Sequence, residues 1–402
     1  MRLKDFSVLN PQYKGESLDC EVSFVPMESL RNGAVDYQDI PFAEGKGKYT
    51  YFQDGDLLVA KVTPCFENGN VAIANNMKQG VGFGSSEIFV LRMNDKVLNT
   101  YMFYITQTAK FQEGACATMC GVGGLKRISP LFMRTYELDI PSLSKQQRIV
   151  NYLDVKLGKI DARIAILEKQ QDAYARLKKS VFHHAVTRGL NPNVSLKDSG
   201  VEWIGMIPEH WELHRFKSIF TECKSVTETG QEDLLSVSEY YGVARRIDKM
   251  EDGEYESRAD SLVGYKVCKK DDLVINIMLA WKRGLGFSDF DGIVSPAYAV
   301  YRGKNIAPHY FHYLMRTDMY VAEYKRNSKG IIDSRLRMYT DRFNNIMAIV
   351  PPLSEQQAIA AYLDEKCSEI DAATENIGKQ IDAMKRLKRA LINEVVTGQR
   401  AI

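Results

Sequence analysis

The sequence has little that would place the protein in a membrane or outside the cell. Its longest apolar runs, such as Leu57–Ala60, fall far short of the ~20 residues of a membrane helix, and its N-terminus lacks the apolar core of a signal peptide. The seven cysteines are an odd number spread along the chain, which favours reduced thiols over a disulfide framework. We therefore expect a cytoplasmic protein. Its net charge of +2 excludes neither DNA nor protein as a partner.

Motifs of catalysis are also missing. No Asn/Asp-Pro-Pro-aromatic tetrapeptide is present to hold a flipped adenine, and no G-x-x-x-x-G-K-[ST] loop is present to hold a nucleotide. The glycines of residues 80–84 lead into a strand-like run rather than a helix, so they do not predict a cofactor site. Cys116 and Cys120 lack a second Cys/His pair to complete a metal site. We expect this chain to carry no catalytic residue, no metal and no cofactor.

The sequence contains a long internal repeat. Residues 141–187 align without a gap with residues 351–397, at an offset of 210, and roughly 22 of 47 positions are identical. This period is too long for a solenoid, whose repeats run to about 20–50 residues. The repeat indicates a duplicated large unit, and a chain of 402 residues suits two or three domains.

Each copy of the repeat predicts one long helix of about 44 residues, roughly 65 Å. Ser144–Gln147 and Ser354–Gln357 have the S-x-x-Q form of a capping box, and prolines lie just upstream. Apolar residues follow in steps of three and four, and this spacing is typical of helices that wrap around each other. The predicted seam is Leu153, Leu157, Ile160, Ile164, Leu167 and Tyr174 in the first helix and Leu363, Cys367, Ile370, Ile377, Ile381 and Met384 in the second. Leu177 and Val181 continue it in the first helix, and Leu387 and Leu391 continue it in the second.

Two arrangements of the helices remain open. Each could pack on its own domain, but matching seams of matching length favour an intramolecular coiled coil. Charge does not decide the orientation, because the acidic first half of the second helix suits either half of the first.

The segments outside the helices carry strand and turn signals in a matching order. Leu57–Ala60 and residues 273–275 each read as a short buried strand, and residues 101–104 (YMFY) parallel residues 310–313 (YFHY). The predicted fold class is α+β with mixed α/β domains. We expect a first domain at 1–140, the first helix at 141–190, a second domain at 191–350 and the second helix at 351–402.

The chain closely resembles the specificity subunit of Type I restriction-modification systems. The resemblance rests on the openings IPSLSKQQRIVNYLD and VPPLSEQQAIAAYLD, on the two helices that they start, and on residues 199–211 (SGVEWIGMIPEHW) before the second domain. It covers essentially the whole chain. The first domain departs from the family pattern, because it has no counterpart of residues 199–211.

The resemblance implies a DNA-binding subunit of a phage defence system. Two target-recognition domains would each read one half of a bipartite, asymmetric site on double-stranded DNA. The helices would pair antiparallel with pseudo-twofold symmetry, set the gap and dock two methyltransferase subunits, which would bind AdoMet; motor-nuclease subunits would be further partners. The alternatives are a methylation-only or related DNA-modifying defence system, an enzyme that acts on DNA by itself, and a coiled-coil scaffold unrelated to DNA.

Basic loops are the candidates for DNA contact. Cations suit phosphates, arginine suits guanine and asparagine suits adenine. Each domain has two candidate loops: one follows the buried strand, and the other lies further along the chain. Solvated loops or hairpin turns would have similar sequences. The second domain has five cations within the 13 residues 325–337, around a glycine, and the first has a glycine-rich loop at residues 114–124. The candidates are Lys61, Asn68, Asn70, Lys126 and Arg127 in the first domain and Lys282, Arg283, Lys325, Arg326, Lys329, Arg335 and Arg337 in the second.

Overall fold

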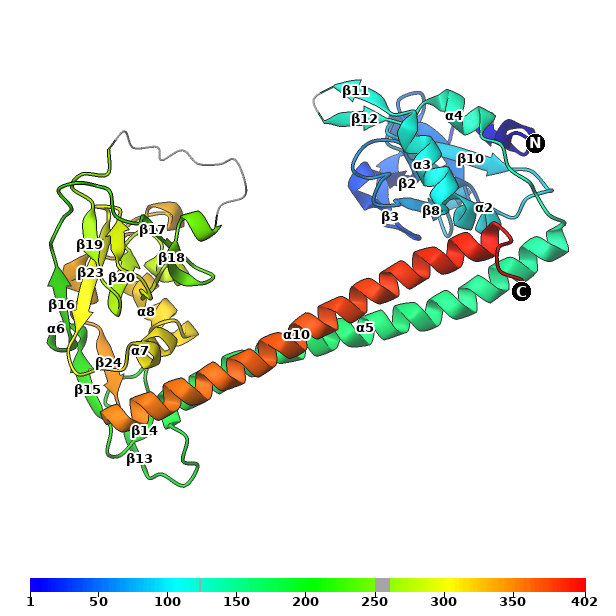
Figure 1. The fold of residues 1–402 in the computed structure, drawn as a ribbon. Helices are drawn as coiled ribbons and strands as arrows, with labels where there is room; N and C mark the ends of the chain where they lie inside the picture. Colours follow the sequence, from blue (N-terminus) through cyan, green and yellow to red (C-terminus); the bar gives the residue numbers. More distant parts are fainter. Residues whose placement is uncertain (123, 250–260) are drawn as a thin grey trace. The chain divides into compact units, whose positions relative to one another are not determined.

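Both long helices are shared between two units of the chain. The computed structural model describes residues 1–122, 124–249 and 261–402 (Figure 1). The first unit comprises Met1–Glu168 and Gly378–Ile402, and the second comprises Lys169–Ile377. Each unit therefore holds one globular part and about half of each helix.

The main sheet of the first unit is antiparallel and four-stranded, in the order β1-β10-β7-β8. The central strand β7 is completely buried, because a helical layer and the rest of the core cover both of its faces. The strands are β1 (Ser7–Leu9), β7 (Leu57–Ala60), β8 (Val71–Ile73) and β10 (Ile88–Met93), and the helices are α2 (Asn99–Thr106), α3 (Ala109–Ala117) and α4 (Pro130–Thr135).

The second unit repeats this sheet in the order β16-β23-β20-β21. Its strands are β16 (Phe220–Cys223), β20 (Asp272–Asn276), β21 (Leu285–Phe287) and β23 (Tyr298–Gly303), and its helices are α7 (Pro308–Met315), α8 (Asp318–Asn327) and α9 (Thr340–Phe343). The two sheets match strand for strand. The mixed α/β fold and the duplication of the globular parts are confirmed.

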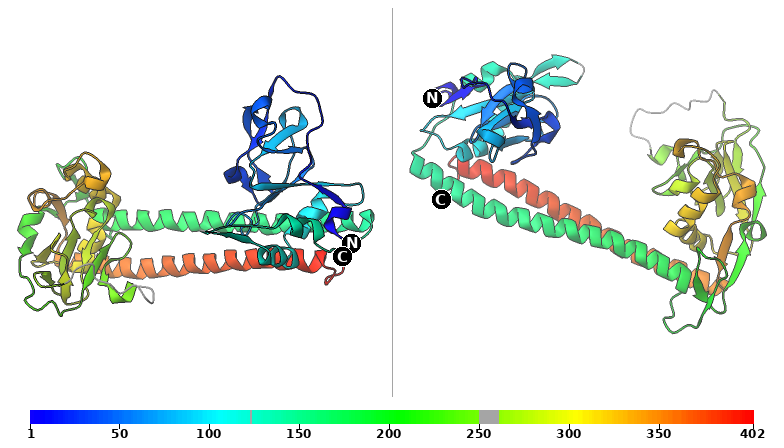
Figure 2. Two further views of the ribbon diagram at one scale, coloured as in Figure 1. Left: turned by 90° about the horizontal axis from the view of Figure 1, so that it is seen from above. Right: turned by 180° about the vertical axis from the view of Figure 1, so that it is seen from behind.

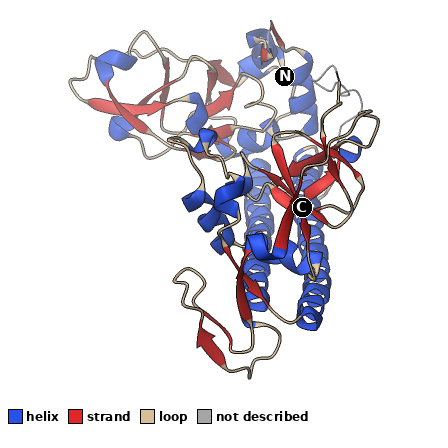
Figure 3. Ribbon diagram, turned by 90° about the vertical axis from the view of Figure 1, so that its left-hand side faces the viewer, coloured by secondary structure: helices blue, strands red, loops and turns tan. Residues whose placement is uncertain are grey.

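The remaining strands differ between the units. Figure 3 draws the strands of both units in red and the helices in blue. The first unit adds a second four-stranded sheet, β5-β2-β9-β6, in which β9 contains the glycine run of residues 81–84 as a buried strand. Its strands are β2 (Glu21–Val25), β5 (Gln38–Pro41), β6 (Thr50–Gln53) and β9 (Val81–Gly84), with β3 (Leu30–Arg31), β4 (Ala34–Val35) and the short helix α1 (Phe42–Gly45) nearby. The second unit adds strand pairs: β13 (Leu196–Asp198) with β14 (Met206–Pro208), β15 (Glu212–Arg215) with β24 (Met347–Val350), β17 (Leu235–Ser238) with β18 (Gly242–Arg245), and β19 (Lys266–Cys268) with β22 (Gly292–Val294), besides the short helix α6 (Phe216–Ile219).

The long helices α5 (Leu143–Arg188) and α10 (Leu353–Val396) run antiparallel within each unit (Figures 1 and 2). In the second unit Lys178 Nζ donates to both carboxylate oxygens of Asp371, at 2.6 and 2.7 Å. In the first unit Lys388 Nζ donates in the same way to Asp161, at 2.7 and 2.8 Å. The two ion pairs are related by the 210-residue offset. The structure therefore confirms the two predicted helices and selects the antiparallel orientation.

Most of the residues predicted for the seam are buried, and the others are partly buried. Leu153, Leu157, Leu167, Leu363, Ile370, Ile377 and Ile381 are buried, and Ile160, Ile164, Tyr174, Cys367 and Met384 are partly buried. The extension is wrong at Leu177 and Leu387, because each is 47% exposed, whereas Val181 is partly buried and Leu391 is buried. A step of four from Tyr174 and from Met384 leads instead to Lys178 and Lys388, which are partly buried and make the two interhelical ion pairs.

Two equivalent glutamines, Gln146 and Gln356, bind the start of each long helix to its own globular part by hydrogen bonds. Gln146 Oε1 accepts from the backbone N–H of Leu98, and Gln356 Oε1 accepts from that of Ala307, both at 2.9 Å. Their amide nitrogens donate to the carbonyls of the two upstream prolines, at 2.8 Å. The predicted capping boxes are wrong, because the helices begin at residues 143 and 353 and the two serines already lie inside them.

None of the helices of the described residues combines the length and the apolar character needed to cross a membrane.

Candidate nucleic-acid interface

In the first unit the fold brings two of the predicted loops together. The segment after β7 lies beside the hairpin of β11 (Cys120–Val122) and β12 (Leu125–Arg127). Val62 bridges Arg127, and the backbone N–H of Thr63 donates to the carbonyl of Lys126 at 2.9 Å. The Thr63 hydroxyl also donates to the carbonyl of Gly124 at 2.8 Å. Lys61, Lys126 and Arg127 therefore occupy one surface, although residue 123 of the glycine-rich loop lies outside the described residues.

Glu87 forms an ion pair with Arg127 at the base of this hairpin and is also close enough to Lys61 to feel its charge. The Arg127 guanidinium donates to both Glu87 oxygens at 2.8–3.1 Å. This hydrogen bonding lowers the pKa of Glu87, and the charge of Lys61 adds to the effect. The Lys61 ammonium also lies 5.4 Å from the ring centroid of Phe89. Lys126 is exposed and is the cation on this hairpin best placed to meet a phosphate.

The two predicted asparagines have different surroundings. Asn68 is exposed on the loop after β7. Asn70 is only 9% exposed, and its backbone bonds to Cys65 and Ala60. Of the two, Asn68 is therefore the one available for contact with a base edge.

The second unit brings the corresponding loops together around Trp281. The loop after β20 lies against the segment that follows α8, where the backbone N–H of Met338 donates to the carbonyl of Ile277 at 2.8 Å. The ammonium groups of Lys282 and Lys325 lie 5.0 and 5.2 Å from the ring centroid of Trp281. A cation from the segment after β20 and a cation from the last turn of α8, 43 positions apart in the sequence, thus lie near one aromatic ring. Such a combination suits nucleic acid, through phosphate contacts and stacking.

The rest of the basic loop continues from this point. Lys329 and Arg337 form a two-way backbone bridge, at 3.0 and 2.9 Å, and Arg335 between them is exposed. Lys325 also pairs with Asp333 at 2.9 Å, and Arg326 pairs with Glu323 at 2.5 Å. Intramolecular carboxylates therefore hold part of the positive charge in place.

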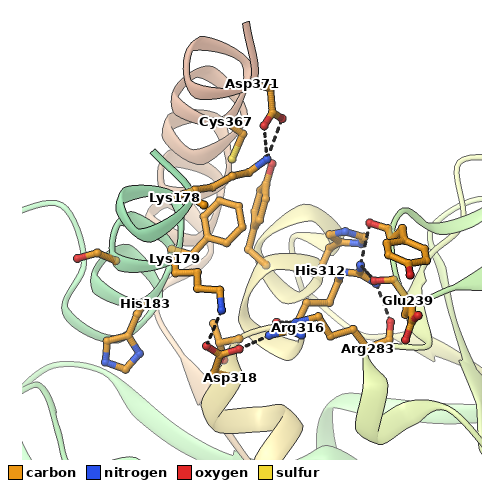
Figure 4. A pocket seen from close by; sticks show the side chains of 16 residues that line it. Lys178, Lys179, His183, Glu239, Arg283, His312, Arg316, Asp318, Cys367 and Asp371 are labelled. Atoms are coloured by element: carbon orange, nitrogen blue, oxygen red, sulfur yellow. Dashed lines mark hydrogen bonds and ion pairs between the residues drawn. The ribbon is translucent and has the colours of Figure 1, made fainter. Parts of the chain in front are cut away.

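The Arg283 side chain is engaged in contacts within the second unit and is not directed freely into solvent (Figure 4). Its guanidinium pairs with Asp318 and donates to the carbonyl of Arg316 at 3.0 Å. Arg316 in turn donates to the carbonyls of Arg283 and Leu285 at 2.7 and 2.8 Å. Asp318 is also 3.6 Å from the ammonium of Lys179 on α5. These contacts anchor the loop after β20 to α8, so Lys282 is the more accessible of the two predicted cations.

Lys179, Arg283, Arg316 and Asp318 line a cavity of about 800 Å³, and His312 also lies in its wall. Burial lowers the pKa of His312 to about 3, and the neighbouring positive charge of Arg316 acts in the same direction. Burial also lowers the pKa of Arg316 to about 10, which leaves it protonated at neutral pH. The histidine is therefore neutral where the arginine is charged, and the pair does not form an acid–base couple at neutral pH.

Each unit has one further residue in its candidate interface that the sequence did not single out: Thr63 in the first unit and Trp281 in the second. Trp281 is not among the predicted contacts, yet the ammonium groups of Lys282 and Lys325 both lie near its ring. Thr63 was not singled out, yet its hydroxyl joins the two loops of the first unit. An aromatic residue directly before Lys-Arg is a usable signal, because aromatic and cationic side chains combine in nucleic-acid sites.

The chain has relatives among known proteins. The model of the Type I restriction modification DNA specificity domain matches residues 16–173. The specificity subunit of the Type I restriction enzyme EcoEI from Escherichia coli is 34% identical over 152 residues, which are 37% of this chain and 26% of that subunit. The EcoAI specificity subunit, also from Escherichia coli, is 31% identical over 226 residues, 54% of this chain and 36% of that subunit. Residues 16–173 are therefore similar to the DNA specificity domain of Type I restriction-modification systems.

The aligned part spans only 26% and 36% of the length of these two specificity subunits. A solved structure concerned with complex assembly and conformational transition of the type I R-M system contains a chain with the same fold. That chain aligns over 98% of this one and 96% of itself, with a TM-score of 0.73 and 13% identity. At this identity the likeness shows the fold, including the two long helices.

Proposed function

We propose that the chain is the DNA specificity subunit of a Type I restriction-modification complex. Each globular part would read one half of a bipartite, asymmetric site on double-stranded DNA, and the paired helices would set the gap. One observation carries the proposal: the same sheet occurs twice, and at the same place on each copy the loops bring cations together with different neighbours. Different loops on equal scaffolds suit two different half-sites.

We further propose that the chain is not catalytic. Two methyltransferase subunits would dock on the helices and bind AdoMet, and motor-nuclease subunits would join where the complex cleaves DNA. A complex that only methylates DNA is the second candidate, since the same specificity subunit would serve it. Adding the purified chain to DNA and labelled AdoMet, with and without a methyltransferase subunit, tests this point. Methylation by the chain alone would contradict the proposal.

The spacing role is tested by lengthening both helices together. Inserting one heptad after Gln171 and one after Ile377 keeps the 3.5-residue seam in phase and adds about 10 Å of helix. At about 3.4 Å per base pair, the gap should grow by about 3 base pairs. Methylome sequencing should then return both half-sites unchanged with a longer gap. An altered half-site would count against a pure spacer, and a seven-residue insertion in one helix alone is the control that should abolish activity.

A further inference from the structure

The hairpin of β11 and β12, here called the first arm, projects from the body of the first unit (Figure 1). It has a counterpart in the second unit at residues 329–337, here called the second arm, whose two end residues form an antiparallel bridge. Just after the first arm, the backbone N–H of Ile128 donates to the carbonyl of Lys61 at 2.9 Å. Just after the second arm, that of Met338 donates to Ile277 at 2.8 Å. Both arms therefore leave the fold beside the loop that follows the buried strand.

Each arm has a glycine directly after its first residue. Gly121 has a φ of +156° and Gly330 a φ of +151°, values that residues with a side chain rarely adopt. A Cβ at Gly121 would lie 2.1 Å from the carbonyl oxygen of Leu125, and one at Gly330 would lie 2.7 Å from that of Arg335. Both positions therefore require glycine, and the two backbones present the residue that follows in the same way.

The residues that follow these glycines are Val122 and Ile331, here called the tip residues. Within residues 1–122, 124–249 and 261–402 they are the most exposed of the large apolar side chains, at 90% and 101%. A single exposed apolar side chain needs no explanation, but here the two highest values fall at one equivalent position of the two units. Folding gains nothing from a side chain that stays in water, so the tip residues are available for a contact outside the chain.

Positive charge surrounds both tip residues. Lys126 is exposed on the first arm, and Lys329 and Arg335 are exposed on the second. Lys325 lies just before the second arm, with its ammonium 5.2 Å from the ring centroid of Trp281. Interfaces between proteins are depleted of lysine, whereas the phosphates that border a base step attract it. The surroundings of the tip residues therefore suit DNA better than a protein.

We propose that each tip residue enters between adjacent base pairs of its half-site and partly unstacks them, while the cations of the same arm hold the flanking phosphates. Proteins that kink DNA insert apolar side chains, isoleucine among them, in this way. The proposal rests on the proposed DNA-reading function and adds a means of selection to it. Pyrimidine–purine steps such as TA and CA are the easiest to unstack, so each half-site should contain one at the position of its tip residue.

The fluorescence of 2-aminopurine in DNA tests the proposal on the full-length protein. The wild-type protein first selects duplexes from a pool of random sequence, and 2-aminopurine then replaces adenine at successive positions of each half-site. Unstacking raises the fluorescence of this base, so the wild-type protein should raise it at one step in each half-site. Val122→Ala should abolish the increase in one half-site and Ile331→Ala in the other. Each half-site thus serves as the control for the other.

Two further variants separate insertion from a general loss of binding. Ile331→Val copies the first arm and should keep the increase. Val8→Ala makes the same change as Val122→Ala at another exposed valine of the first unit, on β1, and should leave both signals unchanged. Because all of these side chains are exposed, the variants should fold as the wild type does.

Three outcomes would overturn the proposal, and they differ in what they say of DNA reading. Selection of a bipartite site with no fluorescence increase at any step would exclude insertion and leave DNA reading intact. Weaker binding when uracil replaces thymine, again without an increase, would assign the tip residues to contact with thymine methyl groups instead. Failure of the wild-type protein to select any sequence would contradict the proposed function, and this inference with it.

Discussion

The two globular parts share their internal polar contacts and differ in their loops. Asp56 is 2% exposed and forms a two-pronged pair with Arg92 at 2.7 and 2.9 Å. Asp272 is 1% exposed and pairs in the same way with Arg302, at 2.9 Å for both bonds. These contacts join neighbouring strands of the sheet in both copies. A buried carboxylate tolerates few substitutions, because an unpaired charge is costly there.

The contacts between sheet domain and helix are also duplicated. Tyr104 donates to Asp154, and Tyr313 donates to Asp364, each at 2.5 Å. With the two glutamines at the helix starts, they fix each long helix on its own globular part. The loops carry no such requirement, so one copy joins its loops through Thr63 and the other gathers its cations around Trp281. The two copies therefore share the contacts that attach the helices and differ in the contacts of their exposed loops.

The largest effect is expected at the residue that only the second unit places in its core. Trp211→Ala should lower the free energy of unfolding of that unit by about 3–5 kcal/mol, since it removes a buried indole and its bond to Glu355. Urea unfolding followed by tryptophan fluorescence measures this, because Trp203 and Trp281 remain as reporters in the second unit. Trp211→Phe should cost much less, and a loss below about 1 kcal/mol would contradict the assigned burial.

The shared carboxylate–arginine pair should show a smaller difference between the units. Asp56→Ala should cost about 3 kcal/mol and Asp272→Ala about 2 kcal/mol, because the Arg92 side chain is 27% exposed and that of Arg302 is 55% exposed. Hydrogen exchange of the β7 and β20 amides measures each unit separately. Equal losses would mean that exposure of the arginine does not set the cost.

The pH response should separate the units through His312, whose counterpart is Phe103. The folded-state pKa of His312 is about 3 and its ordinary value is 6.5. The unfolded chain therefore binds the proton first, so this stability is complete above pH 6.5 and is lost as the pH falls from 6.5 towards 3. The loss should reach up to about 1.4 kcal/mol per pH unit.

His312→Phe copies the first unit and should remove this part of the pH dependence. Urea unfolding of the two proteins at pH 7 and pH 5.5, followed by tryptophan fluorescence, measures it. Phe103→His is the reciprocal variant, and hydrogen exchange should show that it introduces acid sensitivity in the first unit. An unchanged pH profile of His312→Phe would assign the acid sensitivity to other groups.

The smallest effects are expected at the duplicated interhelical ion pairs. Lys178–Asp371 and Lys388–Asp161 are exposed to similar degrees, so each double-mutant cycle should return about 0.2–1 kcal/mol. The two values should agree and should decrease at high salt. A large difference between them would show that the helix pair is less symmetric in energy than in sequence.

The helices could be predicted well and the site only in part. A seam repeating every 3.5 residues is a local property, so the sequence predicts α5 and α10 correctly. The capping boxes at their starts and the seam positions Leu177 and Leu387 were wrong. The four basic loops were also recognisable one by one. Their meeting was not, because Lys282 and Lys325 approach Trp281 only when β20 and α8 pack together.

The duplication, the two long helices and the mixed α/β character can be predicted from the sequence alone, since they follow from periodicity and from repetition at a constant offset. The tertiary structure decided the antiparallel orientation through Lys178–Asp371 and Lys388–Asp161. It also decided which cations are held by carboxylates. These properties depend on contacts between residues far apart in the chain, and no local pattern encodes the distance between them.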